Sequence, residues 1–176
     1  MTEAKKIAFL LANDFEDSEM KNPYEAMIKN GHDNVIISLK ENEELTGKQG
    51  SVSYQSHLAV KDAQASDYAA VIIPGGKSPS HLMDDKDIQA FVQEADQKGL
   101  TISAICHGPQ ILAAAGLLKG RTLTSYPGIQ DEVREAGGQF VDQEVVTDGN
   151  LITSRTPEDE PAFIQATLDA LGSNAW

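Results

Sequence analysis

The chain has 176 residues, with 27 acidic and 14 basic side chains and a net charge of −13 at neutral pH. This length predicts one domain, residues 1–176, with a sizeable buried core. The acidic balance would repel phosphate backbones and argues against stable binding of nucleic acid. One cysteine and four scattered histidines provide neither a disulfide nor a recognisable metal-ligand pattern. We therefore expect no metal and no cofactor, and a single reduced cysteine fits the cytoplasm.

An apolar run at residues 7–12 follows two lysines and superficially resembles a secretory signal. It is six residues long and is followed by acidic residues, so it is better interpreted as a buried strand. No apolar segment approaches membrane-spanning length. These features predict a cytoplasmic protein without a membrane partner.

Short runs rich in Val, Ile and Leu alternate with segments of helical period, which predicts a mainly parallel sheet with helices on both faces. The segment ELTGKQGSVSYQSHLAV predicts a small β excursion, and Pro23 predicts either a kink in the first helix or a restart with Asn22 as cap. Strands are expected, in chain order, at Lys5–Ala12, Val35–Leu39, Ala70–Ile73, Leu100–Ile105, Thr122–Thr124, Val145–Thr147 and Leu151–Ser154. Helices are expected at Asp17–Asn30, Asp85–Lys98, Gly108–Ala115, Ile129–Ala136 and Pro161–Leu171.

Three of the predicted strands end in residues that can carry chemistry. The first is followed by NDFEDSE, which contains Asp14, Glu16 and Glu19, the third by IIPGGKSPSHL, and the fourth by Cys106. Ligands of doubly wound sheets bind at the carboxyl ends of the strands. If these strands are neighbours, carboxylates, glycine N–H groups and a thiol converge on one pocket.

The residue types at this edge suit nucleophilic chemistry. A cysteine at a helix N-terminus is biased toward the thiolate. The N–H groups of Gly75, Gly76 and His107 could stabilise an oxyanion. Glu19 could transfer protons, or could hold the Cys106 thiolate by a hydrogen bond if its own pKa is raised.

Each feature also has a purely structural interpretation. A lone cysteine after an apolar strand is commonly a buried small hydrophobe, and the acidic run can be a solvated face. Adjacent side chains on a sharp turn diverge, so direct pairing of Cys106 with His107 is not expected. The other histidines, His32, His57 and His81, are expected at the surface.

Five segments together resemble the ThiJ/PfpI family, in particular its PfpI-type intracellular proteases and bacterial general stress proteins. They are ANDFEDSE, IIPGGKSPSHL, AICHGPQIL, GRTLTSYPGIQDEVREAGG and LITSRTPEDEPAF, and the resemblance extends from Lys5 to Leu171. It implies a flavodoxin-like, class I glutamine-amidotransferase-like α/β sandwich that forms a homodimer or a hexamer.

The resemblance also implies roles for individual residues. Cys106 takes the place of the family's nucleophile and His107 that of the histidine after it. Glu19 takes the place of the carboxylate that hydrogen-bonds the cysteine, Glu16 lies beside the pocket with Asp14, and Tyr126 matches the family's tyrosine. Family activities include glyoxalase III, a contested deglycase activity and ATP-independent peptidase activity, and the cysteine can be oxidised to a sensing sulfinic acid.

One departure from the family pattern bears on the choice among these activities. PfpI-type peptidases carry an acidic residue after the Gly-Gly-x-x-Pro stretch, where this chain has Ser80. The missing acid favours a small reactive carbonyl as the substrate, attacked by Cys106 and protonated through Glu19. The alternatives are a PfpI-type peptidase and a non-enzymatic redox sensor that uses the same cysteine.

Overall fold

The structure is a computed structural model and describes residues 4–172. The first half forms β1 (Lys6–Leu10), α1 (Asp17–Lys29), β2 (Asp33–Ser38), β3 (Glu44–Thr46), β4 (Ser53–Gln55), β5 (Leu58–Ala59), β6 (Ala70–Ile73), α2 (Ser78–Leu82) and α3 (Lys86–Gln97). The second half forms β7 (Thr101–Ile105), α4 (Pro109–Ala114), β8 (Thr122–Leu123), α5 (Gln130–Glu135), β9 (Gln139–Phe140), β10 (Val146–Asp148), β11 (Leu151–Ser154) and α6 (Glu160–Ala170).

Seven strands form the central sheet in the order β10-β11-β7-β6-β1-β2-β5. All neighbouring pairs are parallel except β10 with β11, which confirms the predicted mainly parallel sheet. The middle strands are continuous apolar runs because both of their faces are covered.

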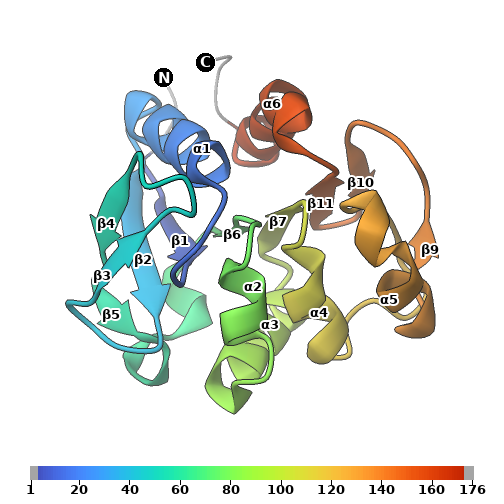
Figure 1. Cartoon of the computed structure of the whole chain (residues 1–176), viewed down its shortest axis with the longest axis horizontal. Coiled ribbons are helices and arrows are strands. Elements are labelled where there is room, and N and C mark those ends of the chain that lie inside the picture. The colour runs from blue at the N-terminus through green and yellow to red at the C-terminus, as the bar shows by residue number, and fades with distance from the viewer. Residues whose placement is uncertain (1–3, 173–176) are drawn as a thin grey trace.

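Helices cover both faces of the sheet, as predicted (Figure 1). Side chains alternate between the faces of a strand, so β1 contributes to two separate cores. Ile7 and Phe9 pack with residues of α1 and α6, including Met27 and Phe163. Ala8 and Leu10 belong to the other core, to which α2, α3 and α4 contribute. No helix within residues 4–172 is long and apolar enough to cross a membrane.

Several smaller predictions can also be compared with the structure. Helix α1 continues through Pro23, so the predicted restart at Asn22 is wrong. The β excursion is confirmed as the hairpin of β3 and β4, whereas β8 pairs with β9 outside the central sheet. The short helix α2 was not predicted, although Pro79 near its start is a recognised helix-start signal.

The order of the strands determines where the site forms. Strand β2 lies on one side of β1 and β6 on the other, so the order in which the chain adds strands to the sheet reverses between β1 and β6. Loops at the carboxyl ends of strands separate at such a point and leave a crevice. The start of α1 and the loops after β6 and β7 meet there.

Candidate active site

Cys106 lies on a sharp turn between β7 and α4 and has a positive φ of 63°. Hydrogen bonds fix the backbone on both sides of the turn. The Cys106 N–H donates to the carbonyl of Ser154 at 3.0 Å, and its own carbonyl accepts from the N–H of Tyr126 at 2.8 Å. The residue is buried, with 7% exposure.

Glu19 projects from the first turns of α1 and is completely buried, with 0% exposure. Its Oε1 accepts the N–H of Gly75 at 2.8 Å. A Cβ on Gly75 would lie 2.5 Å from Glu19 Oε1 and 2.8 Å from Cys106 Cβ, so the glycine fills the narrow space between the two side chains. The prediction of Gly75 as an oxyanion donor is therefore wrong, because its N–H is already bonded to Glu19.

The surroundings of the Cys106 sulfur have opposing effects on the pKa of the thiol. Burial raises the pKa of the Cys106 thiol, and the Glu19 carboxylate raises it further. The backbone N–H groups of Gly76 and His107, which hydrogen-bond the sulfur, and the charge of Lys48 lower that pKa. These two of the three predicted N–H donors thus converge on the sulfur.

Glu19 is surrounded by other charged groups. Burial raises the pKa of the Glu19 carboxyl well above its usual range, although the Gly75 N–H lowers it. Glu16 and Glu160 raise this pKa further, while Lys48 lowers it. The raised pKa favours the protonated form of Glu19. A protonated Glu19 no longer repels a negative charge on the sulfur of Cys106.

His107 contacts the cysteine directly. Its Nδ1 lies 3.3 Å from the Sγ of Cys106, so the expected divergence of these adjacent side chains is wrong. Burial lowers the pKa of the imidazole, and Lys48 lowers it further. The ring of Tyr126 stacks on the imidazole, with centroids 4.7 Å apart and planes inclined by 23°. The neutral imidazole is thus held between the sulfur and the phenol ring.

Lys48, which the sequence did not indicate as a site residue, lowers the pKa of the Cys106 thiol. Lys48 lies on the turn between β3 and β4, and its Nζ is 2.9 Å from Glu16 Oε1. Asp17 holds this turn in place, because its carboxylate accepts the N–H of Gln49 at 2.8 Å and both the N–H and the hydroxyl of Ser51 at 2.9 Å. The only sequence signal for this arrangement was the pair of turn glycines around Lys48.

The remaining predicted residues lie elsewhere. The Asp14 carboxylate lies 3.5 Å from Nε2 of His81, and both residues line a hollow of about 350 Å³ that Cys106 does not line. His57 is exposed, as expected. His32, which was expected at the surface, is buried with 5% exposure. Its Nδ1 accepts the N–H of Lys5 beneath the end of α1.

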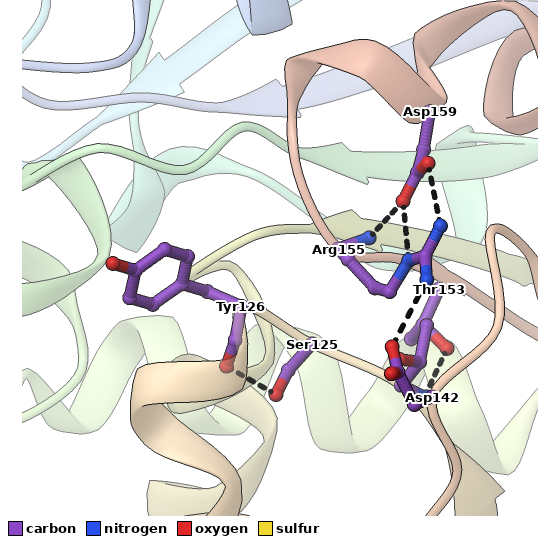
Figure 2. A network of polar contacts seen from close by, with 7 residues as sticks. Ser125, Tyr126, Asp142, Thr153, Arg155 and Asp159 are labelled. Carbon is purple, nitrogen blue, oxygen red and sulfur yellow. Dashed lines mark hydrogen bonds and ion pairs between the residues drawn. The ribbon is translucent and has the colours of Figure 1, made fainter.

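Figure 2 shows polar contacts around Arg155, after β11, and within the loop that carries Tyr126. Arg155, just after β11, donates from Nε to Asp159 at 2.9 Å and from Nη1 to Asp142 at 2.9 Å. The hydroxyl of Ser125 donates to the carbonyl of Tyr126 at 3.0 Å. The N–H of Thr124 donates to the hydroxyl of Thr153 at 2.9 Å, which ties the loop of Tyr126 to β11.

The fold and the site together define an α/β protein with a cysteine on a strand-to-helix turn, flanked by a buried carboxyl and a neutral imidazole. Within the described part of the chain, no group of His, Cys, Asp and Glu side chains is arranged to hold a metal ion.

Comparison with known proteins identifies the family. The DJ-1/PfpI family matches residues 5–170, and the chain belongs to this family. It is 39% identical to the Escherichia coli (strain K12) protein named protein/nucleic acid deglycase 2 over 171 residues, which cover 97% of this chain and 99% of that protein. It is also 39% identical to deglycase PH1704 of Pyrococcus horikoshii over 166 residues, 94% of this chain and 99% of that protein.

Solved structures show the same fold. A two-domain protein from Anabaena variabilis, which contains DJ-1/ThiJ/PfpI-like and ferritin-like domains, superposes with a TM-score of 0.94 at 38% identity. The match covers 96% of this chain and 48% of that protein. Drosophila melanogaster DJ-1beta superposes with a TM-score of 0.87 at 26% identity, over 97% of this chain and 92% of that one. The flavodoxin-like class of the fold, predicted from the sequence, is confirmed.

Proposed function

We propose that this protein is a cysteine enzyme that converts reactive 2-oxoaldehydes, or their adducts on proteins, into hydroxy acids. The observation that carries the proposal is the position of the Cys106 sulfur, between two N–H donors and the buried carboxyl of Glu19. The names of the Escherichia coli and Pyrococcus horikoshii relatives, both deglycases, support this class of substrate.

The reaction begins with addition of the Cys106 thiolate to the aldehyde carbon. The C=O π bond breaks, and Glu19 gives its proton to the resulting alkoxide, which leaves a hemithioacetal beside a carboxylate. The N–H groups of Gly76 and His107 stabilise negative charge, first on the sulfur and then on the developing oxyanion.

Glu19 then transfers a proton between the two carbons. Its carboxylate takes the proton from the former aldehyde carbon, and the C–H bonding electrons form a C=C bond as the neighbouring C=O π bond breaks, which gives an enediolate. Glu19 returns the proton to the second carbon while the hydroxyl proton of the hemithioacetal moves to the oxygen of that carbon, which gives an α-hydroxy thioester without net oxidation. Water cleaves the thioester, releasing the hydroxy acid and restoring the Cys106 thiol. The neutral imidazole of His107, 3.3 Å from the sulfur, is placed to accept the proton of this water.

The geometry does not favour a peptidase. The Ser80 hydroxyl donates to the carbonyl of Lys77 at 2.6 Å and carries no charge that could stabilise an imidazolium. A redox sensor would use the same sulfur without turnover, and it is the second function to be tested. We further propose a homodimer or hexamer in the cytoplasm, where the single cysteine stays reduced.

The decisive experiment measures hydroxy acid formed from methylglyoxal, and adduct removal from methylglyoxal-treated N-acetyl-lysine, by the protein and by Cys106→Ser. We expect turnover that the substitution abolishes, with little loss of stability because serine is nearly isosteric. If neither product forms while peroxide still oxidises Cys106 stoichiometrically, the enzymatic proposal fails and the sensor stands.

A further inference from the structure

We propose that Glu160 is a positioning residue for Glu19, which holds the turn of α1 that carries this carboxyl and sets the pH range in which Cys106 reacts. The inference deepens the proposed function and rests on it for the role of Glu19. It rests on a pair of hydrogen bonds, here called the bridge, that join the Glu160 carboxyl in the first turn of α6 to Ser18 and Asn22 in α1.

Glu160 is buried between the two helices, with 4% exposure. Its Oε2 accepts the hydroxyl of Ser18 at 2.6 Å, and its Oε1 accepts the side-chain amide of Asn22 at 2.6 Å. Ser18 and Asn22 are one helical turn apart and flank Glu19 in the sequence. One carboxyl group therefore fixes both ends of the turn from which Glu19 projects.

This turn needs support from outside the helix. Pro23 lies inside α1 and has no N–H, so it cannot donate to the carbonyl of Glu19 four residues earlier. The helical ladder is thus interrupted at the residue whose side chain must reach Gly75 and Cys106. Glu160 compensates for the interruption because it ties Ser18 to Asn22.

The charge of Glu160 also reaches the site. The groups that face Glu19 are Glu16 at the N-cap of α1, Glu160 on α6, Lys48 on the β3–β4 turn and Cys106 after β7. Burial raises the pKa of the Glu160 carboxyl, whereas the hydrogen bonds that its two oxygens accept from Ser18 and Asn22 lower that pKa. The negative charge of the Glu160 carboxylate opposes the formation of a second one on Glu19.

The test uses two variants and a matched control. Glu160→Gln removes the charge while its amide can still bond Ser18 and Asn22, and Glu160→Leu removes both charge and bridge. Glu158→Gln makes the same charge change at an exposed position two residues away. The first measurement is the rate of iodoacetamide alkylation of Cys106 across pH, which requires no turnover; the second is methylglyoxal turnover.

We expect the midpoint of the pH dependence of alkylation in Glu160→Gln to move to higher pH by roughly half a pH unit, with no movement in Glu158→Gln. Without the charge of Glu160 the Glu19 carboxyl ionises more readily, and its carboxylate raises the pKa of the Cys106 thiol. Glu160→Leu should in addition lower kcat by about tenfold or more with little change in KM, since Glu19 is no longer held in place. A structural role alone would not move the alkylation midpoint.

An unchanged midpoint in Glu160→Gln would overturn the proposal, as would a Glu160→Leu protein that folds and keeps full turnover. If Glu160→Leu does not fold, the midpoint in Glu160→Gln decides. If the wild-type protein does not turn over methylglyoxal, the proposed function fails, yet the alkylation profile still determines whether Glu160 acts on this site.

Discussion

The N–H of Gly75 donates to Oε1 of Glu19 at 2.8 Å, and the glycine has no side chain to separate that carboxyl from Cys106. A backbone group thus occupies one oxygen of the carboxyl. The second oxygen has no hydrogen-bond partner within residues 4–172. The geometry leaves this second oxygen available for exchange of a proton with the sulfur or the substrate.

Gly75→Ala should therefore disrupt the site. Its Cβ would meet Glu19 Oε1 and the Cβ of Cys106 at distances that neither can accept. We expect a loss of about 1–3 kcal/mol in the free energy of unfolding and at least roughly tenfold lower turnover. The control is Gly99→Ala, where φ is 71° but no atom lies within 4 Å of the added methyl, so only backbone strain is introduced. Equal turnover in the two variants would contradict the close packing at Gly75.

Glu19→Gln should lower turnover by roughly two to four orders of magnitude, because the amide keeps the shape of the carboxyl but transfers no proton. Its Oε1 can still accept the Gly75 N–H. The measurement is steady-state formation of hydroxy acid from methylglyoxal. A variant as active as the wild type would remove Glu19 from the mechanism.

The same variant should be more stable than the wild type, increasingly so as pH rises. The folded-state pKa of Glu19 is raised by burial, so its contribution to stability is present below the unfolded pKa and is lost as pH rises through the folded pKa. Thermal unfolding at pH 5 and pH 8 should show a Tm difference that grows by on the order of a few degrees. A constant difference would show that Glu19 is not buried as an acid.

Lys48→Met should move the midpoint of Cys106 alkylation to higher pH, because the ammonium lowers the pKa of the thiol. Lys40→Met, at an exposed lysine, makes the same charge change away from the site and should leave the midpoint unaltered. An identical midpoint in Lys48→Met and the wild type would place Lys48 outside the site.

Asp17→Asn should release the turn that carries Lys48. Burial alone would raise the pKa of Asp17, but the hydrogen bonds from Gln49, Ser51 and Val52 outweigh it and lower the pKa. Loss of these acceptors should reduce the free energy of unfolding by about 1–3 kcal/mol at pH 7. The deficit should shrink as pH falls through the folded-state pKa of Asp17, since protonation removes the same contacts from the wild type. Urea unfolding at pH 7 and pH 3 measures both values.

Ser80→Ala should leave methylglyoxal turnover nearly unchanged, because the hydroxyl bonds only a backbone carbonyl on its own turn. Peptidase activity should be negligible in both proteins, even in an assembled oligomer. A side-by-side assay with fluorogenic peptides and methylglyoxal tests this. Robust cleavage of peptides that depends on Cys106, without hydroxy acid, would overturn the choice of reaction.

The fold could be predicted well where burial alone determines the structure. The ranges of β6 and β11 agree with their predictions to the residue, because Pro74 ends the first and the turn DGN precedes the second. Strand β5 and helix α2 were missed since two and five residues are too few for a period to show. Their formation depends on neighbours that the local sequence does not specify.

The candidate site could be predicted only in part. Cys106, Glu19 and His107 were identified because all three follow the carboxyl ends of strands, an arrangement that parallel topology brings together. Lys48 and Glu160 were missed because they reach the site from a hairpin and from the last helix. Their contribution depends on how distant segments pack onto α1, which no local pattern encodes.

The left-handed backbone at Cys106 has a consequence for engineering. A residue with a Cβ at φ 63° is strained by about 1–2 kcal/mol, which a glycine would avoid. A glycine here would relieve that strain, but it would leave the buried space of the Cys106 side chain unfilled and would remove the reactive sulfur.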